Sequence, residues 1–268
     1  MDYVKRLALK DLNERRCALM EILREQEIPF IHYREKHCDN WVENIIVSIN
    51  PSDKRLVIGA HYDNVIGSTG ANDNATGVST LIKLAHNLIN AKTLSVDIVF
   101  FDREEYQGRG SEKYIETVGK QNISAMLNLD MCGFGDCIAV YSNARENEIL
   151  KNILAKTASG KHKAKIIGYL DNSDHISFLK EDIENVYITM LPSKEIDIVN
   201  ETCMKYLSGG LMPSESDILE IKKSIFPLLE SIKTCHNNTM DSIEYVSEES
   251  MNQMYSFLCD VFNVLHDM

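Results

Sequence analysis

Hydrophobic positions along this 268-residue chain alternate between helical and strand spacing. Between residues 2 and 27, apolar side chains recur every three or four positions, which predicts an amphipathic helix that ends before Pro29. Beyond it, short runs rich in β-branched residues alternate with stretches of helical periodicity. The predicted strands are 30–35, 41–49, 55–63, 94–102, 123–131, 137–141, 164–169 and 185–190, and the further predicted helices are 76–90, 110–119, 146–158 and 247–266.

This alternation predicts an α/β fold, a three-layer α/β/α sandwich with a mixed, mostly parallel central sheet. The apolar content of 44% is enough for a sizeable core, and we expect one domain over residues 1–268. Residues 192–233 interrupt the pattern with prolines, a Gly-Gly pair and an amphipathic stretch at 218–232. Such a long segment is either a lid insertion over a site or an ordinary surface excursion, and both interpretations stay open.

Polar side chains stand where three predicted strands end. His61 closes the run at 55–63, Glu104 and Glu105 follow 94–102, and Asp130 closes 123–131. Because the carboxyl ends of parallel strands meet at one edge of a sheet, we expect these groups to lie close together. Asp73 in GANDNATG (70–77) and His236 in CHNNTMDSIEYV (235–246) supply two more candidates. A buried cluster of acids and histidines is costly without cations, so the sequence predicts a binuclear metal site.

The spacing of these residues indicates individual roles. Asp63 lies two positions after His61 on the same side of an extended segment, where a carboxylate can hold the tautomer of a metal-bound imidazole. The carboxylate of Asp73 has two oxygens and can bridge two ions, although an Asx-rich turn before a helix is the alternative. In the Glu104-Glu105 pair, we assign Glu105 as a metal ligand and Glu104 as the general base. The alternative for this pair is a solvated helix start.

Other polar groups are less specific. A Cys/His zinc site through Cys235 is conceivable, but no second cysteine is suitably spaced. Asp174 and His175 in SDHISF (173–178) are assigned supporting or structural roles. The chain contains neither a GxSxG elbow nor a phosphate-binding Walker loop, so metal-assisted hydrolysis is favoured over covalent catalysis.

Composition narrows the setting. The chain has 28 Lys and Arg against 40 Asp and Glu, a net charge of −12, which argues against nucleic acid or an anionic membrane as the main partner. Seven cysteines occur singly and without CxxC spacing, which is typical of a reducing compartment. The N-terminal residues lack the apolar run of a signal peptide, and no segment has the roughly 18 apolar residues of a membrane span. We therefore expect a cytoplasmic protein, with a homo-oligomer left open.

Taken in order, these motifs resemble the di-zinc aminopeptidase family that includes bacterial leucyl aminopeptidases and aminopeptidase Y. The family pattern is roughly HxD, GAxDNxxG, EExGxxGS, NxDMxG, SDHxxF and a late His before an Asp-Thr pair. In this chain these motifs are His61–Asp63, Gly70–Gly77, Glu104–Ser111, Asn128–Gly133, Ser173–Phe178 and His236–Asp241. The resemblance extends over about residues 40–260.

The resemblance implies a ligand set and a reaction. One metal ion would be held by His61, Asp73 and Asp130, and the other by Asp73, Glu105 and His236. Glu104 would take a proton from the metal-bridging water and return it to the leaving amine of a small peptide with a free N-terminus. Zinc suits imidazole and carboxylate ligands, with manganese and cobalt as alternatives. Tyr206 is a candidate for steadying the oxyanion.

Two departures from the family pattern stand out. Asp241 follows His236 by five residues instead of the usual four, and Asn237 replaces a common Thr or Ser. Two alternative functions also remain. The same fold carries glutaminyl cyclases, which are acyltransferases that close an N-terminal Gln into a ring. It also occurs in non-catalytic binding modules that have lost metal ligands, whereas here the ligand set is complete.

Overall fold

The computed structural model describes residues 1–37, 40–91, 94–106, 108–142, 161–206, 215–236 and 238–266. Within these residues the chain forms one mixed sheet of eight strands in the order β1-β2-β4-β3-β5-β8-β6-β7. The strands are β1 (Ile31–His37), β2 (Asn40–Ile49), β3 (Arg55–His61), β4 (Val96–Phe101), β5 (Ile123–Leu129), β6 (Cys137–Tyr141), β7 (Ala164–Ile166) and β8 (Asn185–Leu191).

The parallel strands lie in the middle of the sheet. β4, β3, β5 and β8 are consecutive parallel neighbours, whereas β1 and β2 on one side and β6 on the other join through antiparallel pairings. β7 then pairs in parallel with β6 at the far edge. The predicted mixed, mostly parallel sheet is confirmed, and the parallel block gathers its carboxyl ends at one edge.

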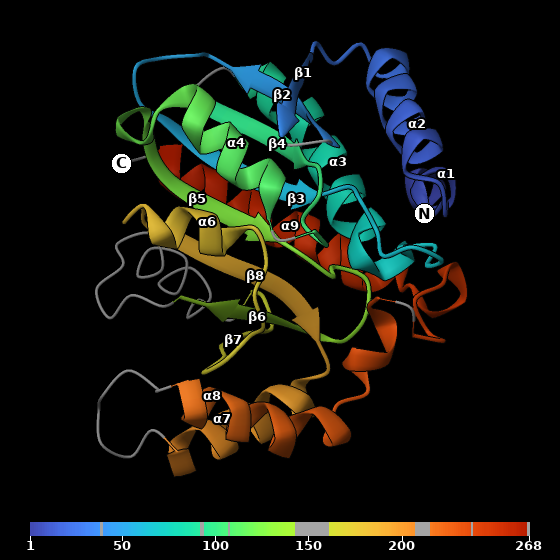
Figure 1. Cartoon of the computed structure of the whole chain (residues 1–268), viewed down its shortest axis with the longest axis vertical. Coiled ribbons are helices and arrows are strands. Elements are labelled where there is room, and N and C mark those ends of the chain that lie inside the picture. The colour runs from blue at the N-terminus through green and yellow to red at the C-terminus, as the bar shows by residue number, and fades with distance from the viewer. Residues whose placement is uncertain are drawn as a thin grey trace.

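Helices cover both faces of the sheet (Figure 1). They are α1 (Asp2–Leu7), α2 (Leu12–Glu25), α3 (Thr76–Ala91), α4 (Arg109–Val118), α6 (His175–Lys180), α7 (Ser193–Tyr206), α8 (Glu215–Ile225) and α9 (Glu248–His266). One face packs on α2, α3 and α9, and the other on α4 and α6 at one end and on α7 and α8 at the other. Strand residues alternate between the two faces, as Phe100 and Phe101 of β4 do, because side chains of a strand point alternately up and down. The three-layer sandwich follows from this alternation.

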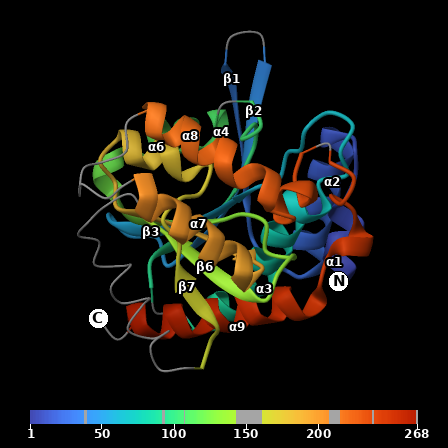
Figure 2. The ribbon, with the colours of Figure 1, turned by 90° about the horizontal axis from the view of Figure 1, so that it is seen from below.

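Two predicted elements differ from the structure. The single helix expected over 2–27 is split into α1 and α2, because the Asp11 side chain accepts a hydrogen bond from the Glu14 amide and starts a new helix. The segment 192–233, read as a lid or a surface excursion, contains two packed helices, α7 and α8. They bury Ile196 and Ile225 against β6 and the end of β8. Figure 2 shows α7 and α8 on the side of the molecule that faces the viewer.

The remaining elements agree with the prediction to within a few residues, although β7 is shorter than 164–169. The helix expected at 146–158 lies outside the described residues, and α6 was not expected as a helix. Among the described helices, none is long and apolar enough to cross a bilayer.

Candidate metal centre

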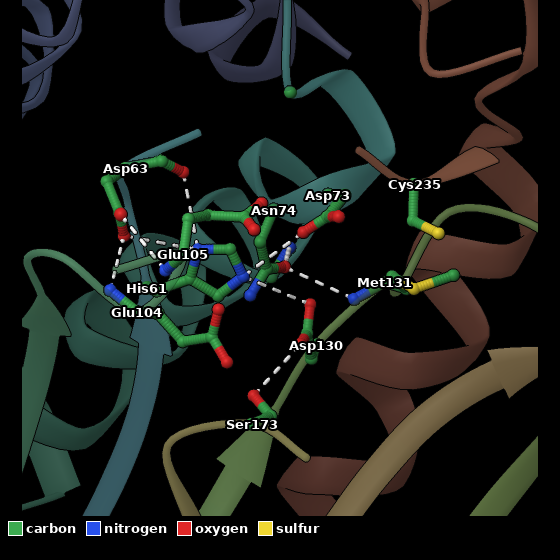
Figure 3. Close-up of polar contacts among 12 residues, drawn as sticks. His61, Asp63, Asp73, Asn74, Glu104, Glu105, Asp130, Met131, Ser173 and Cys235 are labelled. Atoms are coloured by element: carbon green, nitrogen blue, oxygen red, sulfur yellow. Dashed lines mark hydrogen bonds and ion pairs between the residues drawn. The ribbon is translucent and has the colours of Figure 1, made fainter. Parts of the chain in front are cut away.

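His61 is the last residue of β3, and its ring is 1% exposed. Its Nε2 atom lies 3.2 Å from Asp73 Oδ1 and 3.4 Å from Asp130 Oδ1 (Figure 3). Neither His61 Nε2 nor Asp130 Oδ1 has a hydrogen-bond partner, although both atoms are buried. Buried polar atoms are almost always paired, so this convergence fits a cation bound among the three side chains.

Asp63 connects this histidine to the paired glutamates. The Nδ1 atom of His61 lies 3.3 Å from the Asp63 carbonyl oxygen and 3.4 Å from its Oδ1. The two carboxylate oxygens of Asp63 accept hydrogen bonds from the amides of Glu104 at 3.0 Å and Glu105 at 3.2 Å. One buried carboxylate therefore orients the imidazole and also fixes the backbone after β4.

Asp73 sits on a tight turn, Ala71–Ala75, that is held from the far end of the chain. Asp241 Oδ1 accepts hydrogen bonds from the amides of Asn72 at 2.8 Å and Asp73 at 3.2 Å. The other carboxylate oxygen of Asp73, Oδ2, accepts a hydrogen bond from the His236 amide at 3.0 Å. The additional residue between His236 and Asp241 thus leaves Asp241 in contact with this turn.

Arg15 of α2 holds the same turn, and no motif in the sequence indicates this role. The guanidinium is fully buried and donates hydrogen bonds to the carbonyls of Thr69 at 2.8 Å and Gly70 at 2.9 Å. Gly70 has φ +56°, and a Cβ atom there would lie 2.2 Å from Arg15 Nη1. Only glycine suits both the left-handed backbone and the close approach of the arginine.

The second half of the centre is more open. His236 Nε2 lies 3.7 Å from Glu105 Oε2, and the His236 side chain is 61% exposed. Ligand atoms of His61, Asp73 and Glu105 lie within 4.8 Å of one another, and those of Asp73, Cys235 and His236 form a second such group. Asp73 belongs to both groups, as a bridging carboxylate must. Cys235 is a member of the second group, so its thiol is a further candidate ligand there.

Burial and crowding of acids perturb the pKa values in the centre. Burial raises the pKa of Glu104 well above its usual value, with nearby Asp174 adding to the rise and His61 opposing it. Burial, together with the charge of Asp73, raises the pKa of Glu105 to about 8. Burial alone would lower the pKa of His61, but Asp130 and its neighbouring carboxylates outweigh it and raise that pKa well above its usual value. In the absence of cations the cluster retains protons, which bound cations would replace.

Asp130 has supporting partners that the sequence analysis missed. Its Oδ2 atom accepts hydrogen bonds from Ser173 Oγ at 2.9 Å and from the Tyr187 hydroxyl at 3.3 Å. Asn128 in turn donates to Ser173 Oγ at 2.9 Å. Ser173 belongs to the SDHISF motif and was within reach of sequence reasoning, whereas Tyr187 is one residue of a wholly buried strand and gave no sign of a role.

The three remaining candidate residues lie in different parts of the structure. Asp174 is buried near the centre, and burial raises its pKa to about 7, while His61 opposes the shift. His175 packs on the rings of Tyr141 and Tyr187, and burial lowers its pKa to about 4. Tyr206 is exposed at the end of α7, where its hydroxyl lies 3.3 Å from Ser224 Oγ. The structure therefore does not bring Tyr206 to the centre.

Four of the five candidate ligands line a cavity of about 180 Å³, and the fifth, His61, contacts two of them, Asp73 and Asp130. Its floor contains Asp73, Glu104, Glu105, Asp130 and His236. Its walls are mostly apolar and come from the segment before α6, from β8, and from the α7–α8 segment, with Ile167, Leu170, Leu191, Val199, Phe226 and Leu229 among the contributors. The carboxylates of Glu104 and Asp130 point into the same space (Figure 3). The arrangement can bind an apolar group beside a polar, cation-binding floor.

The sequence relatives of this chain include longer proteins that are named aminopeptidases. Aminopeptidase YwaD of Bacillus subtilis is 32% identical over 211 residues, which are 74% of this chain and 38% of that protein. A probable leucine aminopeptidase of Arthroderma benhamiae is 25% identical over 169 residues, which are 56% of this chain and 47% of that protein. The chain thus spans about half the length, or less, of these relatives.

Solved structures share the fold. A zinc aminopeptidase from Bacillus subtilis superposes with a TM-score of 0.63 at 20% identity, over 85% of this chain and 51% of that one. A glutaminyl cyclase from Porphyromonas gingivalis gives a TM-score of 0.67 at 18% identity, over 98% of this chain and 95% of that one. At these identities the likeness shows the fold alone, and the fold class predicted from the sequence is confirmed.

The motif at Glu104–Ser111 departs from the family pattern at one position. Where the family pattern has its first glycine after the paired glutamates, this chain has Gln107, and Gly108 follows one position later; Gly110 and Ser111 keep the spacing. The complete GAxDNxxG motif and the ordered ligand set are unaffected.

The model of peptidase family M28 matches residues 44–261, which include every candidate metal ligand. The chain therefore belongs to peptidase family M28.

Proposed function

We propose that this protein is a metal-dependent aminopeptidase that removes N-terminal residues from small peptides with a free amino terminus. The observation that carries the proposal is the convergence of His61 Nε2 and Asp130 Oδ1, buried and without hydrogen-bond partners, next to an apolar cavity that Asp130 lines. Membership of a peptidase family and the aminopeptidase relatives support it.

The donor set fits two divalent cations. His61, Asp73 and Asp130 would hold one ion, and Asp73, Glu105 and His236 would hold the other. Imidazole and carboxylate ligands suit zinc, and manganese or cobalt can occupy similar sites. Bound ions would lower the pKa of water and polarise the scissile carbonyl.

The side chains have distinct tasks in this reaction. Glu104 takes the proton of the attacking water and delivers it to the leaving amine, a role suited to a carboxylate whose pKa is raised by burial. Asp63 Oδ1 contacts both the Glu104 amide and His61 Nδ1, and so holds the base and the histidine in fixed relative positions. The apolar wall receives the side chain of the N-terminal residue and excludes water around it, so we expect apolar residues of moderate size to be removed fastest.

A glutaminyl cyclase is the second candidate. One observation favours it, because the solved cyclase is covered over 95% of its length, whereas the solved zinc aminopeptidase is covered over 51%. The retained DNATG sequence after Ala71 and the complete ligand set favour hydrolysis. Both reactions place an N-terminal residue at the same floor, so the product distinguishes them.

Mass spectrometry of a peptide mixture incubated with the protein, with and without chelator, tests both candidates. The mixture includes N-terminal Gln peptides and N-acetylated controls. Stepwise loss of N-terminal residues from free-amine peptides only, abolished by chelator, is the expected result. Loss of ammonia from the Gln peptides without residue loss would replace the peptidase by the cyclase, and no change with metal bound would exclude both under these conditions.

Glu104→Gln tests the assignment of the base. We expect kcat to fall by about 10²–10⁴-fold, the usual contribution of general acid–base catalysis, because the amide cannot take the proton. The metal content, measured by mass spectrometry after gel filtration, should stay at the wild-type level, since Glu104 is not a ligand. Wild-type turnover in this variant would remove Glu104 from the mechanism.

A further inference from the structure

Glu195 of α7 is a buried carboxylate that the proposed reaction does not use. It is 1% exposed and lies in the segment 192–233. Its Oε1 accepts a hydrogen bond from the Glu230 amide at 2.8 Å, and its Oε2 accepts from the Ser231 amide at 3.3 Å and from Ser231 Oγ at 2.6 Å. A carboxylate is tolerated in the interior only when donors satisfy it, and these donors all come from two consecutive residues.

These two residues begin the part of the chain that carries His236. The short helical turn Ser231–Thr234 starts there and runs directly into Cys235 and His236. Glu195 therefore ties α7 to the first residue of this turn. The turn begins five residues before the candidate ligand His236 and ends two residues before it.

The other end of the turn contacts the loop of the bridging aspartate. Thr234 Oγ1 donates to the Ser231 carbonyl at 2.7 Å and accepts a hydrogen bond from Asn72 Nδ2 at 2.9 Å. Asn72 immediately precedes Asp73, whose Oδ2 accepts from the His236 amide at 3.0 Å. A continuous set of buried hydrogen bonds thus runs from α7 through the turn to the residues around Asp73.

His236 needs such support more than His61 does. Its φ angle is +53°, a region that residues other than glycine occupy only when their surroundings hold them there. Its side chain is 61% exposed, so little packing restrains the ring. The backbone position of His236 must then be set by hydrogen bonds of the preceding turn and of Asp73.

We propose that Glu195 is a positioning residue that fixes the turn Ser231–Thr234, so that His236 can share the second metal ion with Asp73 and Glu105. The proposal rests on the metal centre of the proposed function. In this interpretation α7 supports one ligand from behind. The segment 192–233 then holds a metal ligand in place, which is a different role from that of a lid or of an ordinary surface excursion.

Glu195→Gln tests the proposal, because the isosteric amide places an NH₂ group among donors that need acceptors. We expect the second zinc ion to bind about 10–100-fold more weakly, as is usual when a group that supports a ligand is removed, with the first ion unchanged. Calorimetric zinc titration of the metal-free protein measures both affinities. Glu201→Gln is the matched control, since it makes the same change at an exposed position of the same helix and should leave both affinities unchanged.

A purely structural role gives a different result. It would lower the melting temperature of metal-free and zinc-loaded protein equally and leave both zinc affinities at the wild-type values, and that outcome overturns the proposal. Equal weakening of both ions also overturns it, because Glu195 is assigned to one half only. If Glu195→Gln does not fold, Ser231→Ala decides in the same assay, since it removes only one of the three hydrogen bonds and should weaken the second ion alone. Wild-type protein that takes up fewer than two ions would instead contradict the proposed metal centre itself.

Discussion

The two histidines of the candidate metal centre are held by different parts of the fold. His61 ends a central parallel strand, is 1% exposed, and has carboxylates around both ring nitrogens. His236 follows the α7–α8 segment and has a side chain that is 61% exposed, with long contacts to Glu105 Oε2 at 3.7 Å and to Cys235 Sγ at 3.6 Å. The first half is set by the sheet, whereas the second depends on a turn that other segments must hold. A site for two metal ions would therefore combine a half that the sheet holds rigidly with a half whose position depends on the surrounding segments.

The largest effect should come from the residue common to both halves. Asp73→Asn keeps the shape of the side chain but removes the charge that both ions would share. We expect each zinc ion to bind at least about 100-fold more weakly, because loss of a group that only supports a ligand already costs about 10–100-fold. Zinc content after gel filtration measures this. Retention of two ions would mean that the halves do not share Asp73.

Replacing each histidine separately sharpens the comparison. We expect His61→Ala to lower the free energy of unfolding of the metal-free protein by roughly 3–5 kcal/mol, since it leaves buried carboxylates without their partner. His236→Ala should change it by less than about 0.5 kcal/mol because the ring is exposed, yet it should weaken one zinc ion selectively. Urea unfolding in chelator and zinc titration provide the two measurements. Equal destabilisation by both variants would remove the distinction between a rigid and a supported half.

Acid should lower the free energy of unfolding through the buried imidazole of His175. Its pKa is lowered by burial to about 4 from an ordinary value of 6.5. Between these values the unfolded chain binds the proton and the folded chain does not, so the free energy of unfolding falls as the pH falls from 6.5 to 4. The shift corresponds to roughly 3 kcal/mol at the low end of this window.

His175→Phe keeps an aromatic ring against Tyr141 and Tyr187 and cannot titrate. Urea unfolding of metal-free wild type and variant across this pH window should show a difference that grows toward pH 4. The comparison cancels the contribution of other titrating groups, including Asp174. Parallel stability curves would mean that the folded protein protonates His175 as easily as the unfolded chain.

Much of the sheet-set half could be predicted from the sequence. Apolar runs that end at His61 and Asp130 locate strand ends, and parallel strands bring such ends together whatever the details of packing. The break between α1 and α2 escaped prediction because the helical periodicity continues across it, and the cap at Asp11 decides the local structure. For Tyr206 and Tyr187 the sequence offered no means of choosing, since the distance of a tyrosine from the centre depends on long-range packing.

In the half of the centre that contains His236, the sequence allowed prediction of the ligand but not of the segments that hold it. The prolines and glycines of 192–233 argued against regular structure, so α7 and α8 were not predicted there. Apolar residues of these helices, such as Ile196 and Ile225, pack on the sheet edge. Glu195 resembles any acid in the first turn of a helix, where acids are common. Its function as a buried acceptor for the turn before His236 follows from contacts between segments that are 35 residues apart.

The double role of Asp63 limits how this centre can be altered by directed evolution. One side chain positions both the histidine at the end of β3 and the two glutamates after β4. Libraries that randomise the loop after β3 or the loop after β4 but keep Asp63 preserve the side chain that positions both. Improvements in activity from the two libraries should then combine. Libraries that include Asp63 change the ligand and the base together, so improvements in one will be masked by losses in the other.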